Sequence, residues 1–125
     1  MMEMLKWGVA AMLLTLFATA QASADGDAGR GKTLFTRCSS CHSMTEQNKV
    51  GPHLSGVFGR PAGTVAGASY SKAMTASGRT WNEQTLEAFL TEPTRVLPGT
   101  TMSAKLPNPQ DRADVIAYLK TLVSP

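Results

Sequence analysis

The sequence predicts an all-α fold in which one small domain, residues 25–125, follows a removable N-terminal segment. Apolar residues recur at helical spacing in separate segments, and no apolar–polar alternation is long enough to build a sheet. Stretches rich in glycine and proline separate these segments and predict ordered loops. The 101 residues of this part suit one domain, but they give it only a thin core of its own.

Residues 1–24 have the features of a cleavable secretory signal. Lys6 supplies positive charge, and Trp7–Ala20 is a predominantly apolar stretch. Ala22-Ser23-Ala24 is an A-x-A cleavage site just before the polar residues that begin at Asp25. An uncleaved membrane anchor is the alternative, but the apolar stretch is short for a span of about 20 residues. The sequence therefore predicts export and removal of residues 1–24.

Two helices are expected near the ends of the remaining chain. Asp27 is a suitable N-cap for a first helix that extends through about Cys38. The last helix is expected from about Gln110 to Leu122. Its apolar face consists of Val115, Tyr118, Leu119 and Leu122.

The middle of the chain alternates loops with shorter helices. Gly51–Gly67 contains five glycines and two prolines without a period, which predicts an ordered loop wrapped around another group. A short helix is expected within Ser69–Ser77, ending before a glycine. Asn82 is a plausible N-cap for a helix over Glu83–Thr91, which ends before a proline. Pro93–Pro109 contains four prolines and is predicted to be loop.

The run Cys38-Ser39-Ser40-Cys41-His42 has the C-x-x-C-H pattern by which a haem is attached covalently. Two cysteines three positions apart on a helical turn point to nearly the same side, so both sulfurs can form thioethers with the two vinyl groups of one haem. The histidine that follows can then bind the iron as an axial ligand. A haem at this position is also the obvious group for the glycine-rich loop to surround.

A haem-free use of Cys38 and Cys41 is the alternative: a small disulfide, a thioredoxin-like redox pair or half of a zinc site. A redox pair is expected at the start of a helix after a buried strand, and no strand-like run precedes Cys38. A zinc site needs two more ligands, but the sequence has no other cysteine, and His53 is its only other histidine. Covalent haem attachment is therefore the favoured interpretation.

The second axial ligand is predicted to be Met102, in the run Pro98-Gly99-Thr100-Thr101-Met102. Adjacent proline and glycine favour a tight turn, which can aim the methionine back into the domain. Met44 lies only two residues beyond His42 and has difficulty reaching the other haem face. Met74, His53 or an open iron position remain the alternatives, because a methionine in a helix is more often core and a lone loop histidine more often a hydrogen-bonding residue.

The charge of the chain does not indicate a nucleic-acid protein. The formal net charge is +3, and removal of Lys6 and Glu3 with residues 1–24 leaves it unchanged. No basic run interleaved with aromatic residues is present. No constellation of catalytic residues, such as a Ser/His/Asp set or a carboxylate pair, is evident either.

Several further segments share the order and spacing of one known family. From Gly26 to Leu122 the chain resembles a class I cytochrome c of the mitochondrial cytochrome c and bacterial cytochrome c2 branch. The matching segments are Gly31-Lys32-Thr33-Leu34-Phe35, Gly51-Pro52-His53-Leu54, Gly59-Arg60, Tyr70-Ser71, Trp81, Pro98-Gly99-Thr100-Thr101-Met102 and Ile116-Ala117-Tyr118-Leu119. The resemblance implies the small cytochrome c fold, with crossing terminal helices and loops around one covalent haem c.

The resemblance also implies roles for residues around the haem. The carbonyl of Pro52 is expected to accept a hydrogen bond from the second ring nitrogen of His42. Arg60, Tyr70 and Trp81 resemble the residues that hold the haem propionates. Thr100 is expected to order the ligand loop. At the crossing of the terminal helices, Gly31 and Phe35 are expected to meet Val115 and Tyr118.

The chain departs from the family pattern near the haem. Phe89 stands where mitochondrial proteins usually have a tyrosine, and Met74 replaces a polar asparagine on the same side. These replacements remove polar groups, so we expect an altered potential. Ala104 stands where a bulky aromatic residue often covers the haem edge. Positions that are commonly lysine carry Thr94, Arg95 and Thr101, which makes a strong basic docking ring doubtful.

The resemblance implies a one-electron carrier rather than an enzyme. The expected partners are periplasmic redox proteins or membrane oxidoreductase complexes, respiratory or otherwise, with no nucleic acid and no stable membrane insertion after cleavage. The expected state is a monomer in the periplasm. A haem enzyme or sensor with an open iron position, a haem-free thiol oxidoreductase and a dedicated subunit of one enzyme are the alternatives. The ligation of Met102, thiol titration and co-purification separate them.

Overall fold

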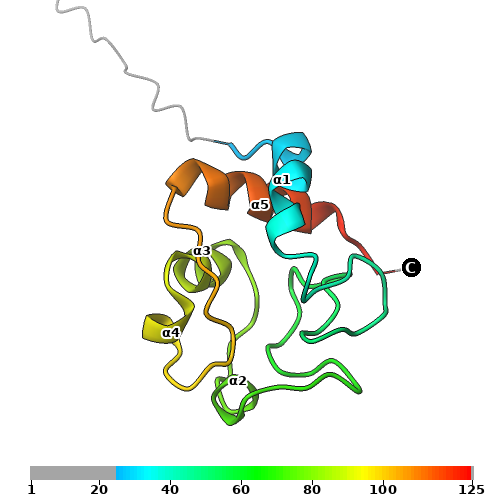
Figure 1. The fold of residues 1–125 in the computed structure, drawn as a ribbon, viewed down its shortest axis with the longest axis vertical. Coiled ribbons are helices and arrows are strands. Elements are labelled where there is room, and N and C mark those ends of the chain that lie inside the picture. The colour runs from blue at the N-terminus through cyan, green and yellow to red at the C-terminus, as the bar shows by residue number, and fades with distance from the viewer. Residues whose placement is uncertain (1–24, 125) are drawn as a thin grey trace, which may run out of the picture.

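The fold is helical, and its first and last helices lie across each other (Figure 1). The structure, a computed structural model, describes residues 25–124, and the predicted signal segment lies outside these residues. Within them there are five α-helices, one 3₁₀ turn and no strand. None of the described helices has the length and apolar character needed to cross a membrane. The all-α prediction is confirmed for this part of the chain.

Helix α1 (Ala28–Leu34) ends where the cysteine motif begins. Its N-cap is Asp27, whose side chain accepts a hydrogen bond from the backbone N–H of Arg30 at 3.0 Å. The helix tightens into a 3₁₀ turn, Phe35–Arg37, and Cys38 caps this turn by donating its N–H to the carbonyl of Phe35 at 2.8 Å. The capping therefore fixes the first cysteine relative to the helix axis.

Helix α5 (Pro109–Thr121) crosses α1 in close contact. Gly31 makes this approach possible, because a Cβ atom there would lie 2.0 Å from the carbonyl oxygen of Asp114. One turn further along the chain, in the 3₁₀ turn that follows α1, the ring of Phe35 packs edge-on against Tyr118, with 5.4 Å between the ring centroids. The expected contact between the terminal helices is thus made through a glycine and an aromatic pair.

Replacing Gly31 with alanine is expected to lower the free energy of unfolding by about 1–3 kcal/mol, the usual cost of forcing extra atoms into a packed contact. Denaturant unfolding of the haem-loaded protein measures this. Gly29→Ala in the same helix is the control, because a Cβ there meets only a carboxylate oxygen of Asp27, at 3.2 Å. Its effect is expected to stay within about 1 kcal/mol. Equal losses in the two variants would contradict the close approach at Gly31.

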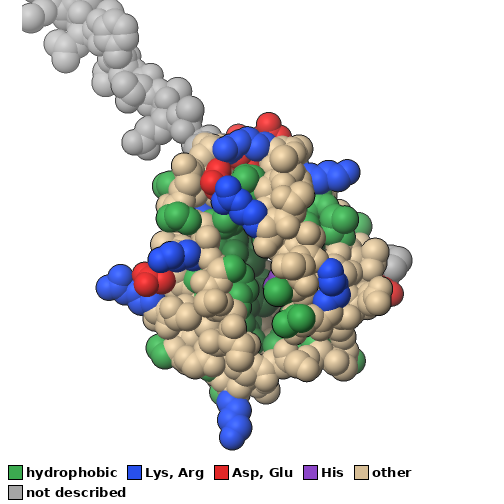
Figure 2. Space-filling model, in the orientation of Figure 1, with side chains coloured by type: hydrophobic (Ala, Val, Ile, Leu, Met, Phe, Trp, Pro, Cys, Tyr) green, Lys and Arg blue, Asp and Glu red, His purple; other side chains and the backbone are tan. Residues whose placement is uncertain are grey.

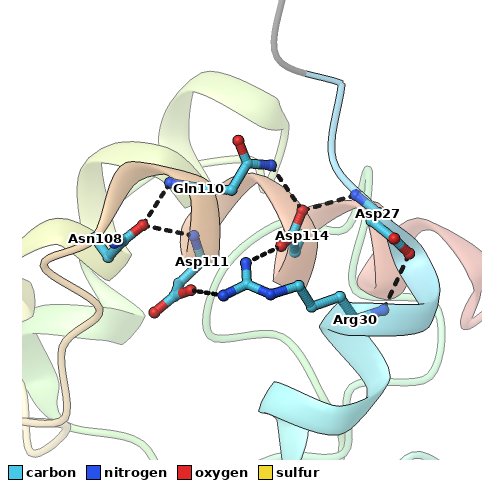
Figure 3. A network of polar contacts seen from close by, with 6 residues as sticks. All are labelled: Asp27, Arg30, Asn108, Gln110, Asp111 and Asp114. Carbon is cyan, nitrogen blue, oxygen red and sulfur yellow. Dashed lines mark hydrogen bonds and ion pairs between the residues drawn. The ribbon is translucent and has the colours of Figure 1, made fainter.

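A polar network joins the same two helices (Figure 3). The buried carboxylate of Asp114 accepts hydrogen bonds from the backbone N–H of Asp27 at 2.8 Å, from the side-chain amide of Gln110 at 2.9 Å and from the guanidinium of Arg30. Arg30 also pairs with Asp111 at 3.0 Å. The bond from the Asp27 N–H, followed by those from Gln110 and Arg30, lowers the pKa of Asp114. The buried charge is therefore fully partnered.

The lowered pKa of Asp114 predicts an acid-dependent stability. The ionised network stabilises the fold fully above the ordinary carboxyl pKa of 3.8, and this contribution is lost as the pH falls through the lower pKa of the folded state. Asp114→Asn should have a lower free energy of unfolding than the original protein at neutral pH. The difference between the two proteins should shrink in acid, because the original protein then loses the contribution of the ionised carboxylate. Urea unfolding of both proteins between neutral pH and strong acid checks this. Parallel stability curves would contradict it.

The middle of the chain carries three further helices. Helix α2 (Lys72–Thr75) is capped by Ser71 and is shorter than the predicted Ser69–Ser77 segment. Helix α3 (Glu83–Thr91) begins, as predicted, at Asn82, which forms a capping box with Thr85.

Helix α4 (Pro93–Val96) was not expected, because Pro93–Pro109 was predicted to be loop. A proline ends the preceding helix, but its fixed φ and missing N–H also suit the first position of a new one. The turn is closed by the N–H of Leu97, which donates to the carbonyl of Pro93 at 2.9 Å.

The glycine-rich segment 51–67 is ordered without regular secondary structure. It is held to the segment before α3 by backbone hydrogen bonds between Gly59 and Trp81 at 2.6 Å and between Trp81 and Arg60 at 3.0 Å. Gly63 has φ +74°, and a Cβ there would come within 2.9 Å of the Cα of Thr75 in α2. The loop therefore closes one side of the domain. The buried core comprises Phe35, Val57, Ala62, Trp81, Leu86, Phe89, Leu90, Leu97, Leu106, Val115, Ile116, Tyr118 and Leu119.

Candidate functional site

A cavity of about 340 Å³ opens between the loops and the core helices. Figure 2 shows it as a hollow with mainly hydrophobic walls and a histidine side chain inside. Its lining comes from the cysteine motif, the 51–67 loop, α2, α3, the segment after α4, and α5. Segments distant in sequence thus contribute to one site.

Cys38, Cys41 and His42 all line this cavity. Cys38 is half-buried and Cys41 is exposed, and the two thiols are not joined in a disulfide. Backbone N–H groups of Cys41 and His42 both donate to the carbonyl of Cys38, at 3.1 and 2.9 Å, so the motif is wound into a tight turn. Burial raises the pKa of the Cys38 thiol. The turn places both sulfurs beside the same hollow.

The imidazole of His42 is oriented by its surroundings. Its Nδ1 donates a hydrogen bond to the carbonyl of Pro52 at 2.7 Å, which leaves Nε2 free to bind a metal. Gly51 lies against the ring, since a Cβ there would come within 2.6 Å of the ring atom Cε1. Burial is the main cause that lowers the pKa of His42. The lowered pKa favours the neutral ring, which is the form that binds a metal.

Met102 lines the same cavity from a segment without helix or strand. The turn before it contains Gly99 at φ +92°, and the N–H of Thr100 donates to the carbonyl of Leu97 at 3.1 Å. The Met102 N–H donates to the hydroxyl of Thr100 at 3.4 Å. Thr100 thus contributes to the order of the turn.

The alternative axial ligands lie in different places. Met74 lines the cavity, whereas Met44 and His53 do not. The sulfur of Met44 accepts a hydrogen bond from the Tyr118 hydroxyl at 2.5 Å. The Nδ1 atom of His53 is buried without a hydrogen-bond partner. Of the four side chains, only Met102 and Met74 are therefore in reach of a group inside the cavity.

Arg60, Tyr70 and Trp81 also line the cavity. The guanidinium of Arg60 donates to the carbonyls of His53 and Ser55 at 3.1 and 3.2 Å, which braces the loop and leaves other N–H groups unused. Burial lowers the pKa of Arg60. The Tyr70 hydroxyl accepts a hydrogen bond from a backbone N–H at 3.1 Å, and its own proton remains available. These groups form the polar part of an otherwise apolar site.

Some wall residues were not identified as site residues from the sequence. Leu86, Leu90, Val115 and Leu119 belong to helix faces, and their helical spacing predicted only that they would be buried. Leu54 and Val57 come from the glycine-rich loop, where no periodicity marks them. The residues that depart from the family pattern, Met74, Phe89 and Ala104, all line the cavity.

The residues present fit a covalently attached haem. Two thiols, an imidazole with a free Nε2 and a thioether line one apolar cavity, and an arginine and a tyrosine supply donors for carboxylates. Soft sulfur and imidazole are ligands that suit haem iron. A thioredoxin-like pair would not need the imidazole and thioether beside the cysteines.

Comparisons with known proteins agree with this chemistry. The family model described as cytochrome c matches residues 28–123. The chain is 46% identical over 99 residues to cytochrome c of Cochliobolus lunatus, covering 76% of this chain and 92% of the relative. It is 47% identical over 106 residues to cytochrome c2 of Rhodomicrobium vannielii, covering 82% and 85%. The solved structure of cytochrome cH from Methylobacterium extorquens superimposes with a TM-score of 0.74 and 42% identity, over 77% of this chain and 99% of that one. The chain therefore belongs to the cytochrome c family, whose members carry electrons with a covalently bound haem c.

Proposed function

We propose that this protein is an exported one-electron carrier that works in the periplasm with His/Met ligation of its haem iron. The observation that carries the proposal is the convergence of Cys38, Cys41, His42 and Met102 on one cavity from two separate segments of the chain. In this proposal Cys38 and Cys41 would hold the haem by thioethers, and His42 and Met102 would bind its iron.

The protein residues keep the site fixed while the charge on the iron changes. When bound, haem iron supplies the one-electron chemistry. Pro52 holds the His42 ring at one angle, and Thr100 orders the turn that carries Met102. Because both ligands would stay in place during electron transfer, little would have to rearrange. The thioether of Met102 would favour the reduced state and so raise the potential.

Arg60, Tyr70 and Trp81 are proposed to hold the haem propionates. A carboxylate in this half-buried part of the cavity needs donors, because burying its charge without them is costly. The free N–H groups of Arg60 and the hydroxyl of Tyr70 can supply such donors, and Trp81 is buried beside them.

The proposed partners are redox proteins or membrane oxidoreductase complexes that meet the cavity mouth. The sequence features of residues 1–24 and the bacterial cytochrome c2 and cH relatives support a periplasmic location. The exposed residues Thr94 and Thr101 are uncharged, and exposed Arg95 pairs with Glu92 at 3.6 Å. We therefore expect weaker steering towards acidic partners than a ring of lysines would give.

Redox titration followed by visible spectroscopy tests the proposed function on the exported protein. The expected result is a reversible one-electron transition, a ferric iron–sulfur charge-transfer band at neutral pH and blocked Cys38 and Cys41 thiols. Mass spectrometry should place the N-terminus at Asp25. Free thiols would support a haem-free oxidoreductase instead. A haem protein without the charge-transfer band would favour an open iron position and an enzyme or sensor.

A further inference from the structure

The segment that carries Met102 has few connections of its own. We refer to residues 98–105 as the Met102 loop; most of its residues are exposed. Within residues 25–124, its one hydrogen bond to a residue outside it runs from the Thr100 N–H to the carbonyl of Leu97, immediately before the loop. The place of Met102 in the cavity therefore depends on how the two ends of this loop are held.

Arg112 of α5 holds the C-terminal end. Its Nη1 donates to the carbonyls of Leu106 and Pro107 at 2.8 and 2.9 Å. The N–H of Leu106 donates in turn to the carbonyl of Leu90, at 2.8 Å, so this residue is fixed on both sides. The backbone just after the loop is thereby tied to both α3 and α5.

The guanidinium of Arg112 is itself fixed. Its side chain is 9% exposed, and its Nε donates to the carboxylate of Glu87 in α3 at 2.6 Å. A buried guanidinium is charged and planar, so its hydrogen bonds to carbonyls are stronger and more directional than those from a neutral donor. An arginine so placed cannot swing away from the carbonyls of Leu106 and Pro107 without also leaving its carboxylate partner.

A second arginine holds the N-terminal end with fewer bonds. Arg79 donates from Nη2 to the carbonyl of Val96, the last residue of α4, at 3.0 Å. Neither Arg79 nor Arg112 lines the cavity. Any effect of these two arginines on the position of Met102 therefore acts through the backbone at the two ends of the loop.

We propose that Arg112, with Arg79 as a weaker counterpart, is a positioning residue that keeps the Met102 loop closed and so sets how often Met102 leaves the iron. The proposal rests on the proposed function, in which Met102 is the axial ligand. Loss of Arg112 leaves the carbonyls of Leu106 and Pro107 without their charged donor. We expect this loss to raise the fraction of protein with an open loop about tenfold, which is the usual effect of removing one charge-assisted hydrogen bond.

Imidazole binding to the ferric haem-loaded protein measures this opening. Imidazole reaches the iron only when Met102 has left it, so its apparent affinity scales with the fraction of protein in the open state. Arg112→Gln should bind imidazole about tenfold more tightly, and Arg79→Gln, which removes one hydrogen bond to a carbonyl where Arg112 makes two, about threefold more tightly. Glu87→Gln removes the partner of Arg112 and should shift binding in the same direction by about threefold. If Arg112→Gln does not fold, the imidazole affinities of Arg79→Gln and Glu87→Gln test the proposal.

Arg30→Gln is the matched control. It makes the same chemical change on α1 and removes ion pairs to Asp111 and Asp114 while leaving the ends of the Met102 loop untouched. It should lower the free energy of unfolding without changing imidazole affinity. Equal tightening in Arg30→Gln and Arg112→Gln would overturn the proposal, because the effect would then be general destabilisation.

The Met102→Ala background separates this proposal from the ligand assignment. With Met102 absent the iron position is already open, so Arg112→Gln should add no further change in imidazole affinity. If Met102→Ala tightens imidazole binding but Arg112→Gln, Arg79→Gln and Glu87→Gln do not, the positioning role is wrong and the ligand assignment stands. If Met102→Ala leaves imidazole affinity unchanged, the ligand assignment itself is wrong.

Discussion

The double variant Cys38→Ala, Cys41→Ala is expected to lose most of its native helix, because it cannot retain a haem covalently. Much of the core faces the cavity that the haem would fill. The residues that belong both to the core and to the cavity wall are Phe35, Val57, Trp81, Leu86, Phe89, Leu90, Val115 and Leu119. At about 24 cal/mol per Å³, an unfilled cavity of 340 Å³ costs about 8 kcal/mol. A domain is usually stable by about 5–15 kcal/mol in total.

Far-UV circular dichroism of the purified double variant measures this loss. Ser39→Ala, Ser40→Ala is the matched control, since it makes the same number of changes in the same turn and leaves both thiols in place. The control should bind haem and retain its helix. Full native helix in the cysteine variant without haem would show that the thirteen-residue core is sufficient by itself.

Met102→Ala is expected to abolish the ferric iron–sulfur charge-transfer band and lower the reduction potential. The thioether favours reduced iron, and its loss opens one side of the iron to water and small ligands. Axial ligands set haem potentials over about 0.8 V, so we expect a fall of at least about 0.1 V. Spectroscopy and redox titration of the purified protein measure both changes.

Met74→Leu is the control for this prediction, because Met74 is the other methionine that lines the cavity. It should keep the charge-transfer band and most of the potential. The reverse pattern, with the band lost in Met74→Leu and kept in Met102→Ala, would assign the sixth position to Met74.

Most of the helices could be predicted from local signals, whereas the cavity wall could be predicted only in part. Asp27 and Asn82 are capping residues, and each begins a helix at the expected position because capping depends on neighbouring backbone groups alone. Helix α4 was not predicted, since Pro93 can end one helix or begin another. Leu54 and Val57 reach the cavity from a loop without periodicity, so only the folded backbone shows their role.

The contacts that hold the loop around Met102 also could not be predicted from local sequence patterns. The Pro98-Gly99 pair predicts a turn from local chemistry. Arg112 lies in a helix where an arginine is ordinarily solvated, and its buried contacts with Leu106, Pro107 and Glu87 join three different segments. Sequence reasoning could identify the methionine that lines the cavity but not the residues that hold its loop.

The crossing of the first and last helices has a consequence for the order in which the chain can acquire structure. Arg30 and its partner Asp114 are 84 residues apart. Helix α1 therefore lacks its partner helix α5 until almost the whole polypeptide has been synthesised, and contacts of such long range form late because a large loop must close first. The two cysteines that follow the 3₁₀ turn after α1 are synthesised early in this interval. Helix α5, which completes the cavity wall, does not yet exist at that point.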